Sequence, residues 1–99
     1  MEETKGLETK KANLVLIDFN ATWCGPCQTM EPIVDKVKDS FRGELEVLRV
    51  DVDENSSIAK NFKIKSVPTL ILLKSGKPIW RHSGILSKKD LETAIKLKL

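Results

Sequence analysis

Long apolar runs are missing from this sequence, and so is the apolar segment of a secretory signal. No stretch approaches the roughly 20 consecutive apolar residues that a helix needs to cross a bilayer. The first 13 residues, MEETKGLETKKAN, contain no apolar run, whereas a signal peptide requires one. We therefore expect no membrane contact and a cytoplasmic location, with an exported protein whose signal has been removed as the alternative.

Metal ligands and clustered positive charges are also scarce. The chain has two cysteines and one histidine, His82, whereas a structural zinc site takes about four ligands, so we expect no metal. Its 17 Lys and Arg residues are scattered among 14 Asp and Glu residues, which leaves a net charge of +3. Because the cations form no stripe, we expect no binding to nucleic acid.

Repeats, linkers and low-complexity tracts are absent as well, so nothing divides the chain. Its 99 residues, of which 40% are hydrophobic, suit one compact domain. We predict a single domain over residues 1–99, in which residues 1–13 are frayed or form a short helix.

What the sequence does contain is an alternation of strand and helix patterns. The apolar run LVLIDF, from Leu14 to Phe19, predicts a buried strand. A helix follows it, because Met30, Val34 and Val37 recur at helical spacing. Further strands are predicted over 44–52, 68–74 and 79–83, a hairpin turn over 75–78, and helices over 55–62 and from Ser87 onward. This order predicts an α/β fold: a mixed sheet of four strands, or five, with helices on both faces.

Both cysteines, Cys24 and Cys27, stand where the first strand gives way to the helix. Side chains three apart on a helix are neighbours, so the two sulfurs can form a disulfide. The loop that this bond closes is too short to stabilise a fold by much, so we expect the pair to carry out chemistry.

The place of each cysteine on the helix predicts its role. The free N–H groups and the dipole at a helix N-terminus favour a thiolate at Cys24. Cys27 lies further into the helix, and we expect it to be more buried and less acidic. Cys24 would then attack a disulfide in a partner, and Cys27 would resolve the mixed disulfide.

Asp18 interrupts the apolar strand six residues before Cys24. If it is buried with no cation nearby, its pKa would rise, and it could take the proton of Cys27 through water. An Asp at the end of a strand, facing solvent, is the equal alternative.

The segment DFNATWCGPCQTMEP resembles the active-site segment of thioredoxins. The likeness continues in VDVDEN, VPT, SGK and SGILSKKDL. The resemblance implies the thioredoxin fold and a thiol–disulfide oxidoreductase that reduces protein disulfides. It implies no bound cofactor, because the electrons reside in the redox-active cysteine pair, and a separate thioredoxin reductase or other electron donor. We expect a monomer.

The resemblance also assigns roles to single residues. Cys24 corresponds to the nucleophile, Cys27 to the resolving cysteine and Asp18 to the buried acid. Pro68 corresponds to the family's cis-proline, although sequence alone favours a trans bond, and Val67 before it would bind an extended substrate through its backbone. The substrate-binding positions implied in this way are Trp23, Gly25, Pro26, Val67, Pro68 and Gly84.

The chain departs from the family pattern at several places. Asn20 stands where thioredoxins usually carry an aromatic residue, and Arg49 stands where a Lys often lies near the buried acid. If Arg49 reaches Asp18, the pKa of Asp18 would rise less, because Arg keeps its charge. Few residues precede Cys24, so we expect the family's first strand to be reduced or absent and strand 44–52 to lie near an exposed edge.

Two other functions remain open. One keeps the fold and reverses the chemistry, giving an oxidant or an isomerase. The other is a non-catalytic module that binds a partner through the groove beside Val67. Replacing Cys24 with Ser would leave the function of such a module intact.

Overall fold

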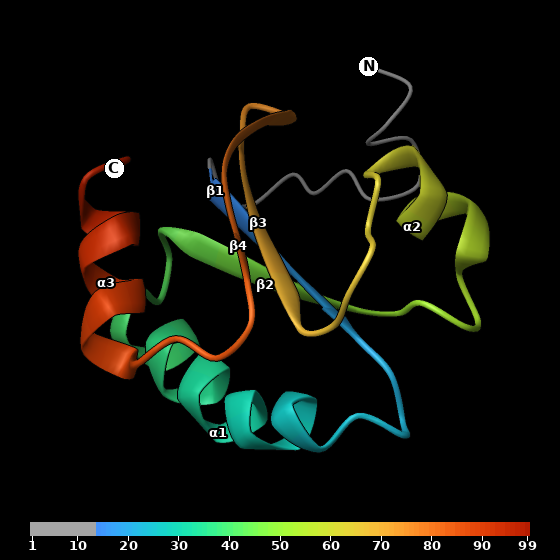
Figure 1. The fold of residues 1–99 in the computed structure, drawn as a ribbon. Helices are drawn as coiled ribbons and strands as arrows, with labels where there is room; N and C mark the ends of the chain where they lie inside the picture. Colours follow the sequence, from blue (N-terminus) through green and yellow to red (C-terminus); the bar gives the residue numbers. More distant parts are fainter. Residues whose placement is uncertain (1–13) are drawn as a thin grey trace.

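The computed structural model describes residues 14–99, which form three helices and four strands (Figure 1). Residues 1–13, for which we predicted a frayed segment or a short helix, lie outside the described residues, as would any counterpart of the family's first strand. The elements are β1 Leu14–Asn20, α1 Gly25–Ser40, β2 Leu45–Asp51, α2 Ser56–Asn61, β3 Thr69–Lys74, β4 Lys77–Ser83 and α3 Lys88–Lys96.

The four strands form one mixed sheet in the order β2-β1-β3-β4. β1 pairs with β2 in parallel and with β3 antiparallel, and β3 and β4 form an antiparallel hairpin. Helices α1 and α3 cover one face of the sheet and α2 lies on the other (Figure 1). The predicted mixed α/β architecture is confirmed, and β2 lies at an edge of the described sheet, as expected.

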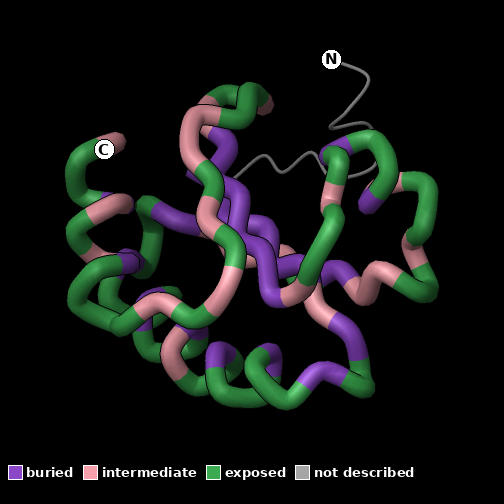
Figure 2. The backbone as a smooth tube through the Cα atoms, in the orientation of Figure 1, coloured by how far each residue is buried: buried purple, intermediate pink, exposed green. Residues whose placement is uncertain are grey.

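The core has two parts, one on each face of the sheet. The part under α1 and α3 contains Leu16 of β1, which is fully buried. The part under α2 contains Ile17 and Phe19, also fully buried. Figure 2 shows the resulting band of buried residues along the central strands. Burial on both faces explains why the sequence of β1 is an almost unbroken apolar run.

Local signals account for the ends of two elements. The side chain of Ser87 caps α3 by accepting a hydrogen bond from the backbone N of Asp90 at 3.1 Å, as Ser at this position predicts. The hairpin turn is shorter than predicted, because Ser75 and Gly76 both adopt positive φ and β4 begins at Lys77. Two such residues close a hairpin without a longer loop.

Within residues 14–99, no helix is both long enough and apolar enough to cross a membrane.

Candidate functional site

The two cysteines lie at the start of α1, directly after β1 ends. Cys24 is the N-cap of this 16-residue helix, with extended backbone angles of φ −97° and ψ 109°. Its Sγ accepts a hydrogen bond from the backbone N of Cys27 at 3.1 Å. The two sulfurs form a disulfide, and the Cα atoms are 5.3 Å apart. Cys24 Sγ therefore occupies the place of a capping oxygen at the positive end of a helix.

The expectation that Cys27 is more buried than Cys24 is wrong. Cys24 is 4% exposed and Cys27 is 7% exposed. Both pack in a small apolar cluster with Ala21, against Val52 and Val67. The sulfur of Cys24 lies 3.6 Å from the carbonyl oxygen of Val67. A segment far along the chain thus covers Cys24. Its position at the helix N-terminus alone would have left it more exposed than Cys27.

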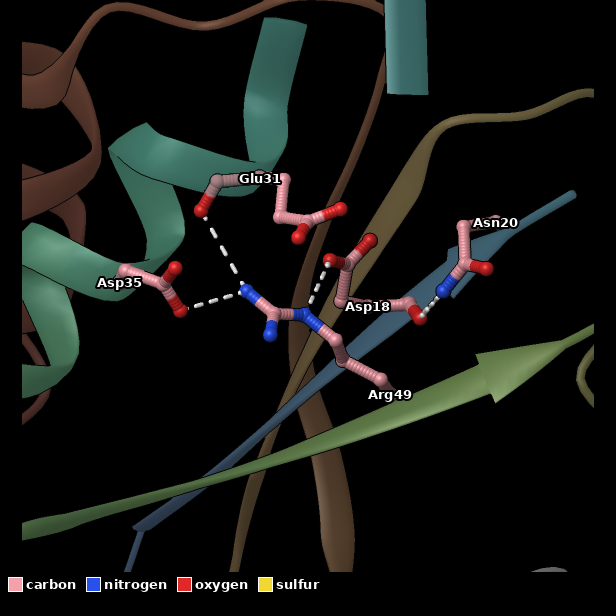
Figure 3. Close-up of polar contacts among 5 residues, drawn as sticks. All are labelled: Asp18, Asn20, Glu31, Asp35 and Arg49. Atoms are coloured by element: carbon pink, nitrogen blue, oxygen red, sulfur yellow. Dashed lines mark hydrogen bonds and ion pairs between the residues drawn. The ribbon is translucent and has the colours of Figure 1, made fainter. Parts of the chain in front are cut away.

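Asp18, near the end of β1, is only 3% exposed. Of the two alternatives for this residue, the buried one is confirmed. Desolvation by burial raises the pKa of Asp18 above its usual range, and the nearby charge of Arg49 opposes that rise. Arg49 Nε is 3.6 Å from Asp18 Oδ2, so the acid has a cationic neighbour (Figure 3).

Asp18 and Cys27 both border an open hollow of about 380 Å³. The half-buried Asn20 also borders it, and its amide Nδ2 donates to the backbone oxygen of Asp18 at 3.0 Å. A hollow of this size has room for several water molecules. Its lining residues are Asp18, Asn20, Ala21, Thr22, Cys27, Gln28, Glu31, Arg49 and Asp51.

Trp23 stands beside Cys24 with 69% of its surface exposed. Its indole Nε1 donates to Asp53 Oδ2 at 2.9 Å, and the backbone N of Asp53 donates to Asp51 Oδ1 at 2.8 Å. The ring is therefore held in place while its apolar surface faces solvent, which is typical of a contact residue for a partner.

The segment before β3 contacts Cys24 through Val67. The peptide bond between Val67 and Pro68 is cis. The carbonyl oxygen of Pro68 accepts a hydrogen bond from Gly84 N at 2.8 Å, and Gly84 has a φ of +96°. Residues that carry a side chain rarely adopt this backbone angle, so glycine is favoured at position 84. Ile85, the next residue, is 53% exposed.

Most of the predicted site residues therefore gather at one end of the sheet. Cys24, Cys27 and Val67 share one apolar cluster, and Asp18 and Cys27 line the same hollow. Gly25 and Pro26 are exposed on the first turn of α1. The roles of these residues in catalysis and substrate binding remain predictions.

Sequence reasoning missed the acidic residues around the site. Asp53 holds Trp23, and Asp35 holds Arg49 through a contact of 2.7 Å between Oδ1 and Nη2. The pairing of β1 with β2 places Arg49 directly opposite Asp18. No sequence pattern indicates the contacts of Asp35 and Asp53, because each joins residues 14 or more positions apart.

None of the residues from 14 to 99 form a group of three or more His, Cys, Asp or Glu side chains placed to hold a metal ion.

Comparison with known proteins gives consistent matches. Residues 5–97 match the family model described as Thioredoxin. Thioredoxin Y1, chloroplastic, of Arabidopsis thaliana is 42% identical over 88 residues, which cover 85% of this chain and 51% of the relative. Thioredoxin of Staphylococcus haemolyticus is 39% identical over 84 residues, covering 85% of this chain and 81% of the relative.

Solved structures resemble the fold equally well. A mutant thioredoxin from Halobacterium salinarum superimposes with a TM-score of 0.81 at 35% identity, covering 87% of this chain and 74% of the other. The structure of a thioredoxin-2 of the malaria parasite gives a TM-score of 0.83 at 34% identity, with coverages of 86% and 82%. The chain spans about half the length of the Arabidopsis relative and about four fifths of the staphylococcal one.

Proposed function

Because this chain belongs to the thioredoxin family, we propose that it reduces disulfide bonds in proteins through the Cys24–Cys27 dithiol. Thioredoxins are protein-disulfide reductases, and the cysteine pair that this reaction requires is present. The observation that carries the proposal is the position of Cys24 Sγ at the N-cap of α1, 3.1 Å from the backbone N of Cys27.

The reaction has two exchange steps. In the reduced protein, the Cys24 thiolate attacks one sulfur of the substrate disulfide, forms a mixed disulfide and releases the first substrate thiolate. The Cys27 thiolate then attacks Cys24 Sγ, closes the intramolecular disulfide and releases the second substrate thiolate. Two electrons pass from the dithiol to the substrate, so no bound cofactor is needed.

The N-terminus of α1 supports the first step. The N–H of Cys27 points at Cys24 Sγ and donates to it, which stabilises negative charge on that sulfur. The helix dipole acts in the same direction. Cys24 is therefore the sulfur that ionises first, and Cys27 stays within bonding distance for the second step.

Asp18 supports the second step. Cys27 must lose its proton before it can attack, and Asp18 borders the same hollow. Burial raises the pKa of Asp18, which brings its proton affinity closer to that of a thiol and makes it a better base at neutral pH. Water in the hollow would carry the proton.

The surface around Cys24 suits an extended segment of a protein substrate. Trp23 and Ile85 present apolar surface, and Val67, Pro68 and Gly84 bring backbone groups to the other side. Such a segment would bind through its main chain, with apolar side chains against Trp23. The expected partners are disulfide-containing proteins and a separate reductase or other electron donor. A monomeric state and a cytoplasmic location stay predictions.

Reduction of insulin with dithiothreitol as electron donor tests the proposal. The wild-type protein should accelerate precipitation of the insulin B chain, and Cys24→Ser should reduce the rate to that of dithiothreitol alone. Equal acceleration by Cys24→Ser would refute the proposal. A redox titration distinguishes the oxidant alternative, because a reductase requires a potential near the reducing end of the family range, about −270 mV.

A further inference from the structure

The guanidinium of Arg49 connects helix α1 with the buried carboxylate of Asp18 (Figure 3). Its Nη2 donates to Asp35 Oδ1 at 2.7 Å and to the backbone oxygen of Glu31 at 3.3 Å. Its Nε lies 3.6 Å from Asp18 Oδ2. One nitrogen thus binds the helix with two contacts, while another faces the acid on β1.

The contacts on the helix are the stronger ones. The distance of 3.6 Å to Asp18 exceeds that of a good hydrogen bond, whereas 2.7 Å to Asp35 is typical of a charge-assisted one. Arg49 lies on β2, at an edge of the described sheet, and its side chain is 39% exposed. A long side chain with that much freedom needs a partner to stay in one conformation.

We propose that Asp35 is a positioning residue: it holds the Arg49 guanidinium beside Asp18, so that helix α1 controls the charge on the buried acid through Arg49. The helix that carries the cysteines thereby also sets the proton affinity of the base that serves them. The effect on catalysis rests on the proposed function, but the effect on Asp18 does not.

Asp35 acts on the pKa of Asp18 in two opposite ways, so the direction in which this pKa moves in a variant tests the proposal. The negative charge of Asp35 disfavours ionisation of Asp18, but its side chain is 56% exposed and water screens it. The guanidinium favours ionisation and stands next to Asp18, whose side chain is 5% exposed. Arg49 lowers the pKa of Asp18, and this effect outweighs the opposite effects of the Glu31 and Asp35 charges.

Other titratable groups around Asp18 leave this argument unchanged. On the remaining side, β3 places the apolar Leu70 opposite Asp18. Within residues 14–99, the charged or titratable groups that face Asp18 or share its hollow are Cys27, Glu31, Asp35, Arg49 and Asp51. Arg49 is the cation among them, so its position decides the balance.

The test is a carbon NMR titration of the Asp18 carboxyl group in the oxidised full-length protein. In Asp35→Asn, the titration midpoint of Asp18 should move to higher pH, because the guanidinium leaves its place. The same substitution made in an Arg49→Met background should not raise the midpoint. A shift to lower pH, or an upward shift that persists without Arg49, would overturn the proposal.

Asp39→Asn is the matched control. Asp39 lies one turn further along α1 and pairs with Arg42 at 3.2 Å, with 70% of its side chain exposed, and it is not among the charges that shift the pKa of Asp18. This variant removes the same charge from the same helix, and the Asp18 midpoint should stay where it is in the wild-type protein. A midpoint that moves equally in both variants would mean that the general charge of the helix, rather than the contact with Arg49, is responsible.

The insulin assay separates this inference from the proposed function. If Asp35→Asn raises the Asp18 midpoint but Cys24→Ser retains full activity, then the contact is real and the proposed function is wrong. If the midpoint fails to rise while Cys24→Ser is inactive, the proposed function stands and the positioning role of Asp35 is refuted.

Discussion

The two faces of β1 begin alike and end differently. Both faces are buried along the strand, and the difference lies in the chemistry of the side chains at the carboxyl end. Phe19, on the face under α2, packs against Phe62 with 5.6 Å between ring centroids. One residue earlier, Asp18 projects from the opposite face toward α1. The first face carries Val15, Ile17 and Phe19, and the second carries Leu14, Leu16, Asp18 and Asn20.

This difference separates the part of β1 that supports the core from the part that borders the candidate site. Leu16 packs under α1 and α3, so the first half of the second face supports the core. From Asp18 onward that face borders the hollow beside Cys27. A buried carboxylate lowers stability unless it has partners. The face under α1 ends in the polar residues Asp18, the proposed base, and Asn20, whereas the face under α2 remains apolar to its end.

The largest expected effect on stability comes from the apolar face. Phe19→Ala should lower the free energy of unfolding by about 3–5 kcal/mol, because it removes a fully buried ring and leaves a cavity. Urea denaturation measures this loss. The insulin-reducing activity per folded molecule should stay close to wild type, and a loss of activity in the folded fraction would show that the two faces are not separate in function.

The next largest effect concerns the rate of reaction. Asp18→Asn should slow release of a thiol from a preformed mixed disulfide on the order of 100-fold, the lower end of what a general base contributes. Stopped-flow measurement of thiol release follows this step. The attack by Cys24 should change much less, and equal slowing of both steps would contradict the assignment of Asp18 to Cys27.

The stability of the Asp18→Asn variant should also depend on pH. Because burial raises the pKa of Asp18 in the folded protein, the ionised acid destabilises the fold at pH values above that raised pKa. Asp18→Asn should therefore be more stable than wild type at high pH. The advantage should shrink as the pH falls through the raised pKa toward the usual range of an Asp, below which both side chains are neutral. Urea denaturation across pH measures it, and an advantage that grows toward low pH would contradict the sign.

The smallest effect is expected at the end of the polar face. Asn20→Ala removes the hydrogen bond from Nδ2 to the backbone oxygen of Asp18, a half-buried contact that contributes about 0.5–1.5 kcal/mol. Activity should stay within about twofold, since the hollow remains open. A loss of stability comparable to that of Phe19→Ala would show that the hollow is part of the packed core.

Sequence patterns were sufficient for the elements and for the cysteine pair. The apolar run of β1 and the helical spacing of Met30, Val34 and Val37 reflect burial, which periodicity reports directly. The pairing of Cys24 with Cys27 is local, because the two residues stand three positions apart at the start of one helix. Both features depend on residues that are close in sequence.

The remaining features depend on contacts between distant segments. The cover that Val67 provides for Cys24 joins residues 43 positions apart, so the order of burial of the two cysteines could not be read from α1 alone. The contact of Arg49 with Asp35 likewise depends on strand register and on the direction of two side chains. Such contacts produce no periodic pattern in the sequence from which they could be predicted.

Trapping of a mixed disulfide tests most directly whether Cys24 attacks the substrate disulfide and Cys27 acts only in the second step. Reduced Cys27→Ser should form a covalent adduct with a disulfide-containing peptide, and peptide mapping by mass spectrometry should place it on Cys24 and show that dithiothreitol removes it. Cys24→Ser should form far less adduct under the same conditions. Equal adducts on both variants, or none on Cys27→Ser, would contradict the roles that the N-terminus of α1 gives to the two sulfurs.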